Sequence, residues 1–291
     1  QPRKTAPGKP RGRVPSERAA QISCCSNLDD LAFDSVLTPA HQEQEHRAGN
    51  QDTDAQNHHV LDLEPREGQC ADGDRLDRCG RGRLDLNALD VFYQAGLRSL
   101  GLAWSRPNAF ANGVPFKFPG SPDTGPGLSD AGRQLVKACN RLGILIDLAH
   151  INEQGFWDTA GSSDAPLVVT HAGAHACCPS TRNLTDKQLD AIKESDGVVG
   201  VNFHVGFLRE DGRREPDTPI SEIVRHIDYI ARRIGIRHVA FGSDFDGAIM
   251  PLELGDVAGL PKLLNALRNH GYDEDALRNP GRAELCDGQD N

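Results

Sequence analysis

The sequence predicts an α/β protein, a (β/α)8 barrel of the TIM type in which only the last five βα units can be recognised. Three observations predict this fold. From residue 86 onwards, short apolar runs alternate with amphipathic stretches, which is typical of parallel strands joined by helices. The apolar runs are continuous rather than alternating, as in strands that are buried on both faces. Each run ends on reactive polar side chains, and (β/α)8 barrels build their active sites at that end of the strands.

The expected elements follow one another in a regular order. A helix over 86–95 has apolar residues at helical spacing and ends at Gly96, a typical C-cap residue, before a strand over 97–104. The later elements are helix 128–142, strand 144–148, helix 152–159, strand 166–170, helix 186–195, strand 198–203, helix 221–235, strand 238–242 and helix 257–269. No glycine-rich phosphate loop follows any strand, which argues against a doubly wound nucleotide-binding sheet.

The two ends of the chain differ from this pattern. Residues 1–85 contain few core-forming side chains among polar tracts, so we expect a poorly folded segment or one translated in the wrong frame. The chain begins with Gln1 and has one methionine, Met250. We therefore expect three parts: the segment 1–85, a partial barrel over 86–278 and an irregular tail over 279–291.

Composition excludes several classes of protein. The chain has 32 Lys and Arg against 42 Asp and Glu, a net charge of −10, which disfavours nucleic acid as a partner. No run of apolar residues is long enough for a transmembrane helix. The basic residues 1–13 lead into no apolar segment, so they are no secretory signal, and we expect the cytoplasm. The eight Cys form no CxxC pair, which favours buried thiols over a zinc cluster.

Two histidines are the first candidate site residues. His150 and His171 are 21 residues apart, one strand–helix–strand repeat, so both fall at the ends of neighbouring strands. Imidazole nitrogens are good zinc ligands, and a catalytic zinc also needs carboxylate or His ligands and water. A pair of hydrogen-bonded histidines with no metal is the alternative interpretation.

Charged residues near the same strand ends complete the candidate set. Asp244 and Asp246 lie in Gly-Ser-Asp-Phe-Asp-Gly, where a carboxylate can move a proton beside a metal or can cap a turn or helix. Arg182 precedes a helix, and its guanidinium suits two-point binding of a carboxylate. An ordinary surface arginine is the alternative interpretation for Arg182.

Several segments together resemble one family. They are Leu-Ile-Asp-Leu-Ala-His at 145–150, and the segments 165–171, 182–184, 200–203 and 242–247. In order and spacing they resemble the membrane (renal) dipeptidase family, the zinc peptidases of family M19. The segment 104–111 with Gly113 resembles the bacterial branch. The resemblance covers residues 86–278.

The resemblance implies a barrel of the metallo-dependent hydrolase kind, with two Zn²⁺ ions, that hydrolyses dipeptides through a metal-bound hydroxide. His150 and His171 match the ligands of the second zinc. Arg182 matches the residue that binds the substrate carboxylate, and Asp244 matches the catalytic Asp, which also contacts substrate. Trp104 stands where the mammalian enzymes have a substrate-binding His, so we expect it to contact substrate as well.

Other family residues have no recognisable match. A His-x-Asp pair holds the first zinc in the family and a Glu bridges both zincs, whereas residues 59–62 read His-x-x-Asp. We therefore expect one zinc or none, and an inactive chain as written. Two alternatives stay open: another amidohydrolase-type barrel such as a deaminase or lactonase, with Asp244 as a metal ligand, or a non-catalytic barrel. The expected partners are a dipeptide and a second copy in a homodimer.

Overall fold

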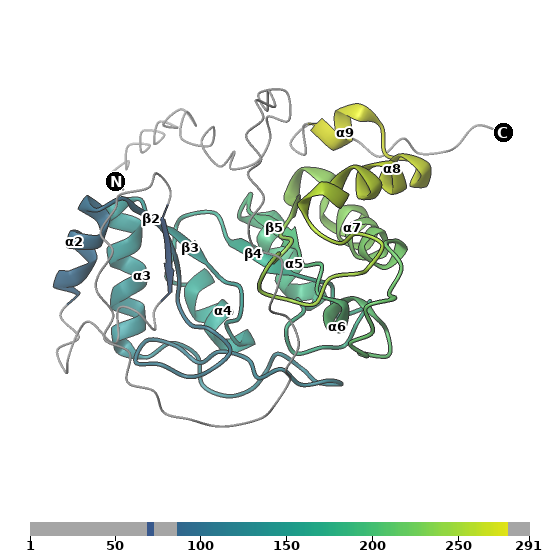
Figure 1. The fold of residues 1–291 in the computed structure, drawn as a ribbon. Coiled ribbons are helices and arrows are strands. Elements are labelled where there is room, and N and C mark those ends of the chain that lie inside the picture. The colour runs from purple at the N-terminus through teal and green to yellow at the C-terminus, as the bar shows by residue number, and fades with distance from the viewer. Residues whose placement is uncertain (1–68, 73–85, 279–291) are drawn as a thin grey trace, which may run out of the picture. The chain divides into compact units, whose positions relative to one another are not determined.

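Six parallel strands lie side by side in the order of the sequence (Figure 1). The computed structural model describes residues 69–72 and 86–278. Its strands are β1 Gln69–Asp72, β2 Leu97–Gly101, β3 Leu145–Asp147, β4 Val168–Ala172, β5 Val198–Val201 and β6 Val239–Phe241. A sequential parallel order is that of a barrel wall, whereas a doubly wound sheet reverses its order at a switch point. The predicted (β/α)8 fold class is therefore confirmed.

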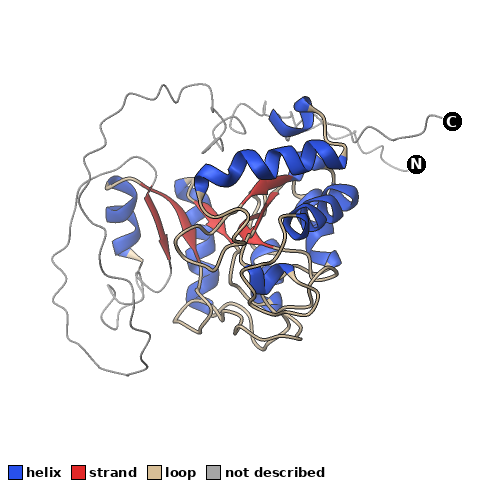
Figure 2. Cartoon of the chain, turned by 45° about the vertical axis from the view of Figure 1, so that its right-hand side comes forward, coloured by secondary structure: helices blue, strands red, loops and turns tan. Residues whose placement is uncertain are grey.

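Helices connect the strands and flank them (Figure 2). They are α2 Asn87–Gln94, α3 Asp130–Leu142, α4 Glu153–Ala160, α5 Asp186–Glu194, α6 Val205–Leu208, α7 Ser221–Ile234, α8 Leu260–His270 and α9 Glu274–Arg278, with the 3₁₀ turns η2 Ile236–His238 and η3 Val257–Gly259. Among the described residues, none of these helices combines the length and the apolar character of a membrane span.

Local sequence signals fix where the helices begin. Ser129 caps α3 by accepting a hydrogen bond from the Gly132 amide, and Asn152 caps α4 in the same way through Gly155. Thr185 and Gln188 form a capping box at the start of α5. Because α5 starts immediately after the segment 182–184, this box also fixes the loop that carries Arg182.

The register of the strands brings their carboxyl ends to one edge. Asp72 of β1 pairs with Gly101 of β2, and Gly101 pairs with Asp147 of β3. Fully buried side chains such as Leu100, Val199 and Ile227 pack between strands and helices. The loops that leave the strands at this edge therefore start at the same level and can share one site.

Strand β1 corrects one expectation. The sequence analysis recognised five strands and expected a poorly folded or mistranslated segment over residues 1–85, but within it Gln69–Asp72 pairs in parallel with β2. The segment Gln-Cys-Ala-Asp has no apolar run, and its backbone bonds to β2 hold it in the sheet. The rest of the segment 1–85 and the tail 279–291 lie outside the described residues, so those expectations stay predictions.

Candidate active site at the strand ends

All five predicted site residues lie at the carboxyl edge of the sheet, in the last residues of a strand or in the loops that follow the strands. Trp104 follows β2, His150 follows β3, His171 lies near the end of β4, and Asp244 follows β6. Arg182 lies in the loop between β4 and α5. Residues more than a hundred positions apart in sequence are thereby gathered by parallel strands.

The two histidines face each other. Their Nε2 atoms are 2.8 Å apart, and their rings cross at 66°. The Nδ1 atom of His150 is 2.8 Å from the Ser105 hydroxyl, and that of His171 is 2.8 Å from the Thr170 hydroxyl. His150 adopts a left-handed backbone conformation with φ 67°, a strained geometry that is common at functional sites.

The pair fits a metal ion as two of its ligands. Two nitrogens bound to one tetrahedral zinc, each about 2.0–2.1 Å away, lie roughly 3.3 Å apart, so the rings need to separate by about half an ångström. Both Nε2 atoms converge, and both Nδ1 atoms have hydroxyl partners that hold the rings in place. Within residues 69–72 and 86–278, no third His, Cys, Asp or Glu joins them.

Electrostatics keep this pair neutral. Burial, the Arg182 charge and the neighbouring His171 lower the pKa of His150 far below its ordinary value. Burial and Arg182 also lower the pKa of His171, against smaller opposing effects of Asp147 and Asp244. Neutral imidazole is the form that binds a metal, so the surroundings favour the competent state.

Arg182 is a buried cation, and no acidic side chain in residues 69–72 and 86–278 forms an ion pair with it. Its side chain is 4% exposed, Nη2 donates to the His171 carbonyl at 3.3 Å, and its guanidinium lies 5.5 Å from the centre of the Phe207 ring. Among the described residues, Nε of Arg182 is a buried nitrogen with no hydrogen-bond partner. Burial lowers the pKa of Arg182 to about 10, although Asp244 and Asp147 oppose this shift. Such a group is suited to receive an anion.

Asp244 is held at the same edge. The buried Asn202 side chain, just after β5, donates from Nδ2 to Asp244 Oδ2 at 3.1 Å. Asp244 has φ 61° and Asp246 has φ 64°, but Asp246 is exposed. The cap interpretation does not hold for Asp246, because Asp256 caps the next helical turn, η3. Of these two aspartates, Asp244 is the one whose charge acts on both Arg182 and His171.

Aromatic rings border the histidines. The Trp104 ring is 43% exposed and its centre is 5.7 Å from that of His150. Phe116 lies edge-on to Trp104 at 5.4 Å and stacks on Phe207 at 6.0 Å. These rings form an apolar wall that contacts His150 at one end and Arg182 at the other, and this wall can contact the body of a small substrate.

Two buried side chains brace the loop between β4 and α5, which carries Arg182. The sequence analysis did not single them out as site residues. Asn183 accepts a bond from the Gly173 amide and donates to the carbonyls of Cys178 and Phe207, at 2.8–2.9 Å. His226 of α7 accepts from the Ala174 amide at 3.0 Å and donates to the Leu208 carbonyl at 2.9 Å. Gly173 fits between them, because a Cβ there would lie 2.7 Å from Asn183 Oδ1 and His226 Nδ1.

We expect Asn183→Ala to lower the free energy of unfolding by about 3 kcal/mol, because three buried backbone groups lose their partner. Urea unfolding measures the change. Asn140→Ala is the matched control: Asn140 is half-buried and bonds the Ser163 side chain, so its loss costs about 1 kcal/mol or less. Equal losses in the two variants would contradict the bracing role.

His226 should make the fold sensitive to acid. Burial lowers the pKa of His226 to about 4 from its ordinary value of 6.5, so the unfolded chain takes up the proton first as the pH falls. The contribution of neutral His226 to the free energy of unfolding is therefore complete above pH 6.5. It decreases as the pH falls towards 4, by about 2 kcal/mol at pH 4.5. The amide of His226→Gln keeps both bonds but does not titrate. We therefore expect the difference in the free energy of unfolding between pH 7 and pH 4.5 to be about 2 kcal/mol smaller in this variant than in the wild type. An unchanged difference would contradict this assignment.

Two further histidines and three cysteines in the described part of the chain have structural surroundings. His175 contacts the Gly120 carbonyl through Nε2 at 2.8 Å, and buried His238 contacts the Gly197 carbonyl through Nδ1 at 2.7 Å. Cys139, Cys177 and Cys178 are buried, and burial raises the pKa of each thiol. These three thiols are thus unreactive at neutral pH, as the sequence analysis expected.

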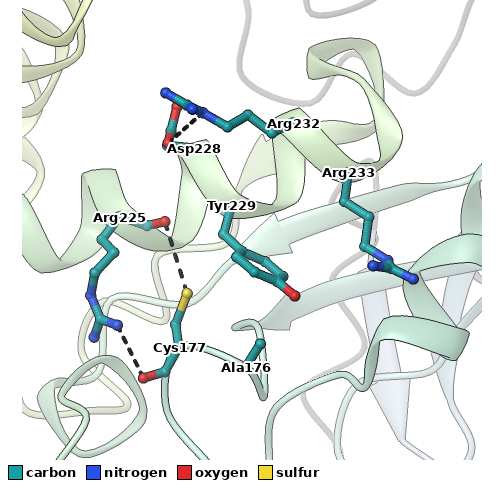
Figure 3. Close-up of a pocket in the computed structure, with 7 residues that line it drawn as sticks. All are labelled: Ala176, Cys177, Arg225, Asp228, Tyr229, Arg232 and Arg233. Carbon is teal, nitrogen blue, oxygen red and sulfur yellow. Dashed lines mark hydrogen bonds and ion pairs between the residues drawn. The ribbon is translucent and has the colours of Figure 1, made fainter.

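A hollow on α7 lies apart from this site (Figure 3). It is lined by Ala176, Cys177, Arg225, Asp228, Tyr229, Arg232 and Arg233. Each of its arginines has an acidic partner: Arg225 pairs with Glu222, Arg232 with Asp228, and Arg233 with Asp186 and Asp190. Because each of these arginines is paired, the hollow is lined by ion pairs, and none of its arginines is left unpaired for a ligand.

The sequence of this chain matches the model of a known family over residues 80–280, described as membrane dipeptidase (peptidase family M19). The chain belongs to the M19 membrane dipeptidase family. The resemblance seen in the motifs is thus confirmed, and with it the TIM-type barrel.

Known proteins of similar sequence and structure agree with this assignment. An uncharacterized protein in the pqqA 5′ region of Klebsiella pneumoniae is 60% identical over 195 residues, 67% of this chain and 70% of that protein. Dipeptidase tcpJ of Claviceps purpurea is 30% identical over 210 residues, 71% of this chain and 47% of that protein. A crystal structure of a Rhodobacter sphaeroides metallo peptidase, liganded with a phosphinate mimic of L-Ala-D-Ala, is 51% identical with a TM-score of 0.67. The matched region makes up 73% of this chain and 65% of the Rhodobacter sphaeroides chain.

Proposed function

We propose that this chain is built as a metal-dependent dipeptidase that binds dipeptides with a free C-terminal carboxylate. The observation that carries this proposal is the buried Arg182, whose Nε has no partner among the described residues and whose Nη2 bonds the backbone of His171. A carboxylate at Arg182 would satisfy the cation and bring the peptide bond towards the histidine pair. The dipeptide mimic bound to the Rhodobacter relative supports the same class of substrate.

Each candidate residue has a distinct role in this proposal. Arg182 binds and orients the substrate carboxylate, and the wall around Trp104 contacts the substrate body and keeps water away. Asp244, held by Asn202, carries the proton to the nitrogen of the leaving amine. His150 and His171 would hold the metal, for which we propose Zn²⁺; a bound zinc polarises a carbonyl and activates water.

The donor set supports one zinc rather than two. The described residues supply two imidazole ligands and no group of three. Weak binding of one zinc, low or absent turnover and a homodimer remain predictions for this chain. The deaminase or lactonase alternative requires Asp244 as a metal ligand, whereas Asp244 bonds Asn202 and belongs to no ligand group in the described part of the chain.

The test is hydrolysis of L-Ala-D-Ala by the purified full chain with added ZnCl₂ or with EDTA, alongside equilibrium binding of the dipeptide. Zinc-dependent hydrolysis that is lost in Arg182→Met supports the proposal. Zinc-dependent binding without hydrolysis supports an inactive dipeptidase site. If the chain binds neither zinc nor the dipeptide, the non-catalytic alternative holds and the proposed function is wrong.

A further inference from the structure

A continuous hydrogen-bonded path links the end of β3 to Nδ1 of His171, the ring nitrogen that faces away from His150. Asp147 Oδ2 accepts from the Thr170 hydroxyl at 2.6 Å, and the same hydroxyl oxygen is 2.8 Å from His171 Nδ1. We propose that Asp147, acting through the Thr170 hydroxyl, is a positioning residue that fixes the proton of His171 on Nδ1. His171 Nε2 is then left with its lone pair, ready to act as a ligand.

The assignment follows from counting hydrogens. A carboxylate only accepts, so the single hydroxyl hydrogen of Thr170 points to Asp147. The Thr170 oxygen can then only accept from His171, and Nδ1 must carry the ring proton. Metal-bound histidines usually donate their second nitrogen to such an acceptor, which sets both the tautomer and the ring orientation.

The backbone fixes the carboxylate that starts this path. Asp147 Oδ1 accepts from the amides of Ala149 and Thr170, both at 2.9 Å, which leaves Oδ2 for the hydroxyl. The register between β4 and β5 shifts between Val169 and Ala172, and such irregularities re-aim side chains next to active sites. Thr170 and His171, although consecutive, can therefore bond to each other.

His150 differs from His171 in this respect. Its Nδ1 contacts the Ser105 hydroxyl, and no described carboxylate bonds that hydroxyl, so Ser105 can donate or accept. The Nε2 atoms are 2.8 Å apart, and one of them must carry a proton in the metal-free protein. Since His171 carries its proton on Nδ1, His150 Nε2 is the donor. His171 is thus a preset ligand, whereas His150 changes tautomer when a metal binds.

The inference rests on the proposed metal site, but the tautomer that it assigns is a property of the metal-free protein. We therefore test it first without metal, by ¹⁵N NMR of the full chain, with the His171 signals identified by their loss in His171→Gln. We expect a protonated, pyrrole-type Nδ1 and a pyridine-type Nε2. The opposite pattern, or an even mixture, overturns the proposal.

The variant Asp147→Asn tests the role of the Asp147 carboxylate most directly. The amide keeps an oxygen for the two backbone donors and presents an N–H₂ group to Thr170, so the hydroxyl must donate to His171 Nδ1 instead. We expect the His171 tautomer to invert, with the proton on Nε2. Thr170→Val should release the tautomer into a mixture, and Thr170→Ser should restore the wild-type pattern. Ser105→Ala, the matched control at His150, should leave the His171 signals unchanged.

Zinc affinity is the second readout, with folding checked for each variant by urea unfolding. We expect Asp147→Asn and Thr170→Val to weaken zinc binding by about 10–100-fold, and Thr170→Ser to recover most of the loss. If the wild type shows the expected tautomer but binds no zinc, the proposed function fails and the tautomer assignment stands. If folded Asp147→Asn keeps the wild-type tautomer and affinity, Asp147 does not position His171 and the inference is wrong.

Discussion

We expect Arg182→Met to weaken binding of L-Ala-D-Ala by about 100-fold, because a buried charge-assisted contact to the substrate carboxylate is worth roughly 3 kcal/mol. The same change lowers kcat/KM by a similar factor wherever turnover is measurable. Arg182→Lys recovers only part of the loss, since an ammonium cannot form the two parallel bonds of a guanidinium. Calorimetric titration with the dipeptide measures both variants.

The C-terminal amide of the same dipeptide is the control ligand for Arg182. The wild type should bind L-Ala-D-Ala-NH₂ as weakly as Arg182→Met binds the free acid, and Arg182→Met should bind both ligands about equally. The two losses are then not additive, which identifies the carboxylate as the partner of Arg182. Fully additive losses would contradict the assignment.

Arg182 should also reduce the stability of the ligand-free protein. Burial lowers the pKa of Arg182 from 12.5 to about 10, which corresponds to a cost on the order of 3 kcal/mol for the charged form. We therefore expect Arg182→Met to unfold at a higher urea concentration than the wild type while it loses the ligand. A trade of stability for binding is typical of functional sites.

Asp244→Asn lowers kcat for dipeptide hydrolysis by roughly 10²–10⁴-fold, because an amide cannot carry the proton to the leaving amine. Binding of the dipeptide changes little, since Arg182 and the wall around Trp104 remain. The amide can still meet Asn202 by turning its oxygen towards the donor. Steady-state kinetics at saturating zinc measures kcat and KM separately.

Asp246→Asn is the matched control for Asp244. Asp246 lies two residues later in the same loop with a nearly equal φ, 64° against 61°, but it is exposed. Asn tolerates this conformation, so neither substitution adds backbone strain. We expect unchanged kcat in Asp246→Asn. A loss in both variants would indicate that the loop as a whole, and not the Asp244 carboxylate, limits the reaction.

The sequence predicted the parts of this fold that have a periodic signal. Strands β2 to β6 and helices α3, α4, α5 and α7 follow the apolar runs, and helix starts agree with capping residues such as Ser129 and Asn152. The short helix α6 was not predicted. Strand β1 was missed because the sequence Gln-Cys-Ala-Asp contains no apolar run, whereas its backbone pairs with β2. No sequence period reports such pairing.

The residues of the candidate site were predictable where they stand at the end of a predicted strand. Strand ends pointed to His150, His171 and Asp244, and the structure brings these loops together. Asn202, Thr170 and His226 could not be assigned, because their roles depend on which backbone groups the fold places beside them. The Nε2–Nε2 contact of the histidines depends on the strained backbone of His150 and the shifted register after Val169. Neither backbone feature has a simple signature in the sequence.

Zinc binding by the purified full chain tests the central claim most directly. Equilibrium dialysis against buffered Zn²⁺ should give one ion per chain, and His150→Ala and His171→Ala should each abolish that binding. His175→Ala, a histidine near the same loop with a backbone partner, should keep it. Zinc binding that persists without His150 and His171, or a wild type that binds none, would contradict the assignment of this pair as the metal site.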